Sequence, residues 1–67
     1  MSLGKRIENL RDVKGISQKE LSKVLDIHPS VMNRIELGTR PVRDDEIVKI
    51  ATYFDITTDE LLGNKLK

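Results

Sequence analysis

The sequence predicts a compact all-α domain built from five short helices. Apolar residues recur three or four positions apart along most of the chain, as they do on one face of an α-helix. Glycines, prolines and helix-capping residues divide the chain into segments of helical length with tight connections. No stretch shows the sustained alternation of a strand. With 67 residues and no cysteine, we expect one domain over residues 1–67 that rests on aliphatic packing, without disulfides.

The first two predicted helices lie on either side of Gly15. The first carries Leu3, Ile7 and Leu10 at helical spacing, and Gly15 ends it because glycine adopts the left-handed C-terminal conformation at little cost. The second opens with the capping box Ser17-Gln-Lys-Glu20. Its apolar stripe is formed by Leu21, Val24 and Leu25.

The third predicted helix, about Pro29–Leu37, starts near His28 and ends at Gly38. Pro29 fits the first helical position, where its missing N–H is not needed and its fixed φ suits a helix. Only about three residues, Asp26 to His28, separate this helix from the second. So short a link favours a steep crossing of the two helices, the helix-turn-helix arrangement.

Two more helices complete the prediction. The fourth runs from about Arg43 to Phe54 after the loop "TRPV". Its inward-facing residues are expected to be Ile47, Ile50, Ala51 and Phe54. A second capping box, Thr57-Thr-Asp-Glu60, opens a short helix that carries Leu61 and Leu62 and ends at Gly63.

Charge is divided unequally along the chain. Residues 1–43 hold nine Lys/Arg and five Asp/Glu, a net charge of +4, whereas residues 44–67 hold three and six, a net charge of −3. Such a split is compatible with a polyanion-binding face at one end. It is equally compatible with two solvated surfaces whose charges differ by chance, and charge alone does not separate these interpretations.

The outer face of the third helix carries polar residues that can read DNA. On a helical wheel Met32 and Ile35 fall on one side, and Ser30, Asn33 and Arg34 fall opposite. Arginine pairs with guanine, asparagine with adenine, and serine with several bases in the major groove. Taken alone, the wheel favours an ordinary solvated face, because polar residues are expected outside.

Two charged residues occupy unexpected places. Arg11 lies beside Leu10 on the apolar stripe of the first helix, and Glu36 lies near the inward side of the third. A buried carboxylate requires a partner. We therefore expect Arg11 and Glu36 to form an ion pair that ties the first helix to the end of the third; the alternative is two half-exposed surface charges.

The segments "RIENLRDVKGISQKELSKVLDIHPSVMNRIELGTRP" and "IVKIATYFDITTDELLG" resemble the Cro/CI-type, or Xre-like, helix-turn-helix domain of phage and bacterial repressors. The resemblance covers about residues 5–63, with the helix-turn-helix at about 17–37. It rests on short motifs that occur in the order and at the spacing of the family: Leu10-Arg11, Ser17-Gln18 with Leu21, Ile35-Glu36 before Gly38, and "DELLG". It implies the five-helix fold of the lambda repressor, binding to operator DNA and a symmetric dimer.

The resemblance also implies roles for individual residues. The positions that face base edges are Pro29, Ser30, Asn33 and Arg34, although proline offers no hydrogen-bond donor. The positions expected to contact phosphates are Gln18, Lys19, His28, Thr39, Arg40 and Arg43, although His28 could equally be a loose cap at the start of the third helix. Arg11 and Glu36 match a pair that forms an internal salt bridge in the family. Two departures are Asp26, in place of the usual turn glycine, and Ser22, in place of a small alanine where the second and third helices touch.

The expected function is therefore regulation of transcription, with repression the favoured effect, by a homodimer bound to a palindromic double-stranded operator. Leu61, Leu62 and Leu66 are the expected dimer contacts; the alternative is that Leu61 and Leu62 cap the core, and we expect one of these two to do both. The alternative is an antitoxin-like or adaptor protein that binds another protein. An enzyme is not expected, and neither is a cofactor or a metal, because Asp44-Asp45-Glu46 suits the start of a helix better than a metal site. The absence of cysteine, of a signal peptide and of a long apolar run fits a cytoplasmic protein.

Overall fold

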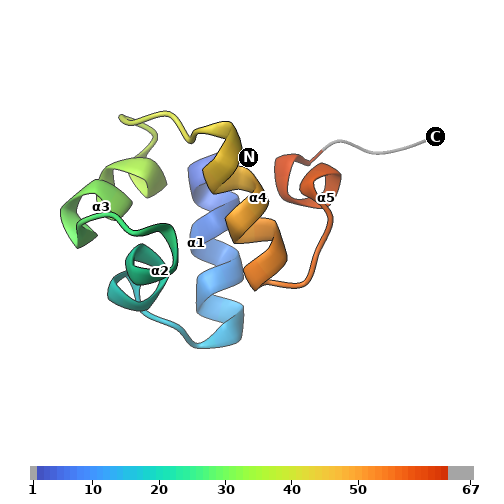
Figure 1. Ribbon diagram of the computed structural model, residues 1–67, viewed down its shortest axis with the longest axis horizontal. Helices are drawn as coiled ribbons and strands as arrows, with labels where there is room; N and C mark the ends of the chain where they lie inside the picture. Colours follow the sequence, from blue (N-terminus) through green and yellow to red (C-terminus); the bar gives the residue numbers. More distant parts are fainter. Residues whose placement is uncertain (1, 64–67) are drawn as a thin grey trace.

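The computed structural model describes residues 2–63 and consists of five α-helices in the predicted order (Figure 1). They are α1 (Leu3–Lys14), α2 (Gln18–Leu25), α3 (Pro29–Leu37), α4 (Asp44–Tyr53) and α5 (Thr58–Leu62). No strand occurs between residues 2 and 63. The all-α fold class expected from the sequence is confirmed. None of the helices in this range is long and apolar enough to cross a membrane.

The helix ends follow the local sequence signals. Both expected capping boxes are present, because Ser17 accepts a hydrogen bond from the backbone N–H of Glu20 and Thr57 accepts one from that of Glu60. Gly15, Gly38 and Gly63 adopt the left-handed conformation at the ends of α1, α3 and α5. The expected ends of these three helices are therefore confirmed.

Asp26 ends α2 in the left-handed conformation, with φ 56° and ψ 47°. Aspartate is one of the few residues other than glycine that visits this region readily. Its backbone N–H donates to the carbonyl of Lys23 at 3.2 Å, and the next N–H, of Ile27, donates to Ser22 at 3.0 Å. These bonds close α2, so that α3 can start three residues later without the family's usual glycine.

All five helices contribute to the core. Its buried apolar side chains are Ile7, Leu21, Leu25, Met32, Ile35, Ile50, Ala51, Phe54 and Leu61. α1 packs against α3 on one side and against α5 on the other, and α2 packs against α3 and α4. Figure 1 shows α3 and α5 at opposite sides of α1. A surface on α3 and a surface on α5 are therefore separate from each other.

Gly4 makes a close contact that the sequence pattern did not predict. α1 begins at Leu3, with Ser2 as its N-cap, and so includes residues ahead of the region that resembles the family. A Cβ atom at Gly4 would lie only 2.5 Å from the backbone oxygen of Glu36. Glycine therefore allows the first turn of α1 to pack against the last turn of α3.

Leu61 corrects part of the expected dimer surface. Its side chain is completely buried in the core, so it cannot contact a second subunit while the domain is folded. Leu62, the next residue, is 41% exposed. Leu66 lies outside the described residues. Of the three expected contacts, Leu62 alone is placed on the surface of the described part of the chain.

Candidate nucleic-acid interface

α3 has an inner and an outer face, divided as the wheel predicts. Met32 and Ile35 are buried in the core. Ser30, Asn33 and Arg34 are exposed together on the opposite side. Because α3 lies at the edge of the molecule in Figure 1, these three side chains are accessible to a large partner.

His28 caps the start of α3. Its Nδ1 accepts a hydrogen bond from the backbone N–H of Ser30 at 3.1 Å and lies 2.9 Å from the hydroxyl oxygen of Ser30. An Nδ1 that accepts must be unprotonated, so the proton of the neutral ring is on Nε2. Pro29 occupies the first helical position, as expected. His28 therefore fixes the first turn of α3 and keeps one N–H for another partner.

The expected ion pair between Arg11 and Glu36 is present. The Nε atom of Arg11 donates to Oε2 of Glu36 at 2.8 Å, and Nη2 donates to Oε1 at 3.1 Å. The third nitrogen, Nη1, donates to the carbonyl of Ile16 at 3.0 Å. The hydrogen bond with Glu36 raises the pKa of Arg11 above its ordinary value. The pair joins α1, the α1–α2 connection and α3, as a bidentate contact of this kind can.

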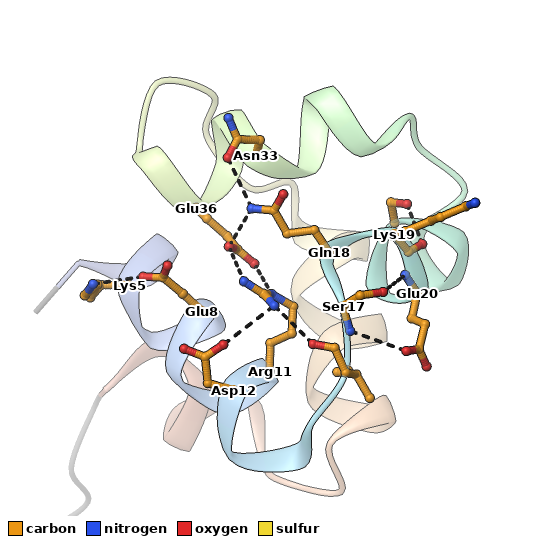
Figure 2. A network of polar contacts seen from close by, with 12 residues as sticks. Lys5, Glu8, Arg11, Asp12, Ser17, Gln18, Lys19, Glu20, Asn33 and Glu36 are labelled. Carbon is orange, nitrogen blue, oxygen red and sulfur yellow. Dashed lines mark hydrogen bonds and ion pairs between the residues drawn. The ribbon is translucent and has the colours of Figure 1, made fainter.

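Gln18 extends this pair toward the exposed face of α3 (Figure 2). Its Nε2 atom donates to Oε1 of Glu36 at 2.9 Å and to Oδ1 of Asn33 at 3.2 Å. Gln18 is the first residue of α2, so its backbone N–H is among those for which a helix supplies no acceptor. The side chain that we expected on a phosphate thus points instead to two protein residues.

A second ion pair, between Arg40 and Glu46, was missed from the sequence. Nη1 of Arg40 donates to Oε1 of Glu46, and Nη2 donates to Oε2 at 2.9 Å. Glu46 also accepts from the backbone N–H of Arg43 at 2.9 Å. Hydrogen bonding from Arg40 lowers the pKa of Glu46 and raises that of Arg40. Glu46 is thus buried as the partner of Arg40, in addition to lying in the first turn of α4.

The remaining expected phosphate contacts lie around α3. Lys19 is exposed near the start of α2, and Arg43 is exposed at the N-cap of α4. Thr39 is exposed just after α3, where its hydroxyl donates to the carbonyl of Arg34 at 3.3 Å. Arg40, by contrast, is largely committed to Glu46. Between residues 2 and 63 no cluster of His, Asp or Glu side chains could hold a metal ion.

The sequence pattern of the Helix-turn-helix family matches residues 7–61. That match covers most of the chain and includes α2, α3 and α4 in full. The chain belongs to this family. Its type is that of the Xre and Cro/CI transcriptional regulators, as the ordered motifs indicated.

Relatives of this helix-turn-helix domain are regulators that are longer than the chain. ImmR of Bacillus subtilis, an HTH-type transcriptional regulator, is 35% identical over 63 residues, which are 94% of this chain and 50% of that protein. RamB of Mycobacterium tuberculosis, another such regulator, is 35% identical over 54 residues, or 81% of this chain and 11% of that protein. The chain thus spans half or less of these relatives.

A solved structure is similar along nearly its whole length. The crystal structure of the restriction-modification controller protein C.AhdI from Aeromonas hydrophila has a TM-score of 0.79 with this helix-turn-helix domain and 37% sequence identity. The alignment covers 88% of this chain and 89% of that one. The five-helix arrangement is therefore that of a known regulator.

Proposed function

We propose that this helix-turn-helix domain binds a specific double-stranded DNA site by placing α3 in the major groove. The observation that carries the proposal is the outer face of α3, where Ser30, Asn33 and Arg34 are exposed together while Met32 and Ile35 hold the helix to the core. The major groove is wide enough to admit an α-helix. The net positive charge of residues 1–43 supports the same orientation.

Base recognition is assigned to the three exposed polar residues of α3. Arg34 suits guanine, whose O6 and N7 both accept hydrogen bonds, and Ser30 can contact several bases. Asn33 lies one position before Arg34 on the same face. Pro29 has no donor, so it contributes shape at most, and specificity rests mainly on Asn33 and Arg34.

Phosphate contacts are assigned to groups around α3. Lys19, Thr39 and Arg43 present donors near the two ends of the helix-turn-helix, and His28 presents one at the turn between its helices. Gln18 offers its backbone N–H at the positive end of α2. We assign Arg40 to holding the loop between α3 and α4, because Glu46 occupies its Nη1 and Nη2 nitrogens.

We further propose that the domain acts as a homodimer on a palindromic operator and represses transcription. Leu62 is an exposed apolar residue of α5, and α5 lies on the opposite side of α1 from α3 (Figure 1), which leaves α3 free for DNA. A dimer of this kind places its two half-sites about 34 Å apart, one turn of DNA. Leu66, beyond the described residues, is proposed as a second contact.

In vitro selection of binding sites from random DNA tests the proposal. We expect a palindromic sequence, and an affinity that falls steeply as the salt concentration rises, because binding releases counterions from the DNA and this release is less favourable at higher salt. Arg34→Ala should lower affinity by about 1–3 kcal/mol and relax the preference at one base of each half-site. Lys19→Ala is the matched control, since loss of a phosphate contact should weaken all sequences alike. An unchanged preference for Arg34→Ala would contradict the assigned reading face.

An adaptor or antitoxin-like protein is the second candidate, and an apolar groove favours it. The groove lies between α1 and α5, and Val13, at its edge, is 81% exposed. Its apolar walls include Leu10, Val13 and Ile56. A protein of this class would select no DNA sequence in the same experiment.

A further inference from the structure

We propose that Gln18 is a positioning residue that fixes which end of the Asn33 amide faces DNA. Through Gln18, the buried ion pair of Arg11 and Glu36 makes Asn33 a hydrogen-bond donor toward the bases. Cytosine is therefore disfavoured at the base position that Asn33 contacts. This inference rests on the proposed function and adds a rule for one position of the operator. Figure 2 shows the four side chains in order from Arg11 through Glu36 and Gln18 to Asn33.

The direction of the hydrogen bonds begins at Arg11, which has only donors to offer. Its Nε and Nη2 atoms contact both oxygens of Glu36, so both oxygens act as acceptors. The Glu36 side chain is only 3% exposed, and a buried acceptor of this kind must be matched by donors. Whatever else approaches Glu36 must therefore present hydrogen atoms.

The next contact fixes Gln18. Its amide can turn either its oxygen or its NH₂ group toward a neighbour, and the two ends have nearly the same shape. Because the nearby Oε1 of Glu36 accepts, the NH₂ group of Gln18 must face it, at 2.9 Å. The orientation of the Gln18 amide thus follows from the chemistry of its partner.

The last contact fixes Asn33. The same NH₂ group of Gln18 lies 3.2 Å from the side-chain amide of Asn33, so Asn33 must turn its oxygen inward to accept. The NH₂ group of Asn33 is then directed away from Gln18, on the exposed face of α3. Both hydrogens of the Gln18 amide are used in these two contacts, so this group has none left for a phosphate.

The bases differ in what they offer to such a donor. In the major groove guanine, adenine and thymine each present an acceptor, namely N7 or O6, N7, and O4, whereas cytosine presents only its N4 amino group, a donor. Two donors that face each other form no hydrogen bond. On the contacted strand Asn33 should therefore reject cytosine, by about tenfold for one lost bond of ordinary strength.

Site selection with a series of Gln18 variants tests this mechanism, and Asn33→Ala first identifies the base position that Asn33 reads. Gln18→Met keeps the approximate shape without a donor, and Gln18→Ala removes the side chain. Both should free the Asn33 amide to rotate and reduce the discrimination against cytosine there from about tenfold to less than about threefold. Gln18→Lys supplies donors to both Glu36 and Asn33, so it should keep the discrimination.

The outcomes separate this inference from the proposed function. Loss of discrimination in Gln18→Met and Gln18→Ala, with rescue by Gln18→Lys and no change at the base read by Arg34, supports it. A general loss of folding would instead disturb all positions, which thermal unfolding of each variant detects. Unchanged discrimination in Gln18→Met, no rescue by Gln18→Lys, or no position affected by Asn33→Ala overturns the inference while the proposed function stands. If the unaltered protein selects no sequence, the proposed function fails and the inference fails with it.

Discussion

The two buried carboxylates between residues 2 and 63, those of Glu36 and Glu46, have similar partners but connect different parts of the molecule. Each carboxylate side chain is 3–4% exposed and accepts two hydrogen bonds from one guanidinium. Arg11 donates to Glu36 through Nε and Nη2, and Arg40 donates to Glu46 through Nη1 and Nη2. Arg11 and Glu36 are 25 residues apart, on α1 and α3. Arg40 and Glu46 are six residues apart and enclose only the α3–α4 loop and the start of α4. The same chemistry thus fixes a tertiary contact in one case and a local loop in the other.

The remaining partners of each carboxylate extend this difference. Glu36 accepts a third hydrogen bond from Gln18, a residue that also contacts the exposed face of α3. Glu46 accepts its third bond from the backbone N–H of Arg43, which caps α4. Between residues 2 and 63 no buried side-chain polar atom lacks a hydrogen-bond partner. Removing either carboxylate must therefore leave donors unmatched, but on different parts of the molecule.

Breaking the long-range pair should have the largest effect on stability. Glu36→Ala leaves Arg11 and Gln18 without their acceptor in a partly buried place, and we expect the free energy of unfolding to fall by about 3–5 kcal/mol. A domain of this size has about 3–10 kcal/mol in total, so the variant should lose a large part of its stability. Urea denaturation at pH 7, followed by circular dichroism, measures this.

Glu8 supplies the matched control for Glu36. It forms an ion pair with Lys5 on the exposed side of α1, at 2.9 Å. Exposed pairs contribute little, and Glu8→Ala should leave the free energy of unfolding nearly unchanged. If the two variants lost equal stability, Glu36 would have no special role in joining α1 to α3.

Breaking the local pair should have a smaller effect. Glu46→Ala frees Arg40, whose side chain is 20% exposed and can turn into solvent, so the expected loss is about 1–3 kcal/mol. The α3–α4 loop should also lose its order, which weakens binding to all DNA sequences. Preference among bases should not change, because no contact of Glu46 reaches Ser30, Asn33 or Arg34. A changed base preference in Glu46→Ala would contradict this division between the two pairs.

The two pairs differ equally in how well the sequence predicts them. Arg11 and Glu36 interrupt apolar stripes, and a charge on an inward-facing helix position indicates a buried partner. Arg40 lies in an irregular loop, where no periodicity predicts the direction of a side chain. Glu46 already had an adequate explanation as an acid in the first turn of a helix. Nothing in the sequence therefore indicated that Arg40 and Glu46 form an ion pair.

In the rest of the fold, the features that local sequence determines were also predicted, whereas those that depend on contacts between helices were not. The helices and their caps follow from local chemistry, so the five segments and their stops were predicted nearly to the residue. The close approach at Gly4 depends on where α3 passes α1, which no local pattern records. Leu61 and Leu62 are adjacent in a helix of five residues, too short for periodicity to decide which one faces the core. The contact of Gln18 with Asn33 likewise depends on side-chain conformations across two helices.

Acid should weaken the local pair without truncating any side chain, and this is the smallest effect expected. The pKa of Glu46 lies below its ordinary value of 4.5 because Arg40 donates hydrogen bonds to it in the folded state. The pair therefore contributes its full stability above about pH 4.5, and the contribution is lost as the pH falls through the lower pKa of the folded state. Glu46→Gln, which keeps the shape and cannot ionise, should be less stable than the unaltered protein at pH 7, and the difference should shrink below pH 4.5. Urea denaturation of both proteins from pH 7 to pH 3 measures it. A stability difference that stayed constant over this range would show that the charge of Glu46 contributes nothing. Its role would then be to accept hydrogen bonds from Arg40 and from the backbone of Arg43, whether the carboxyl group is ionised or protonated.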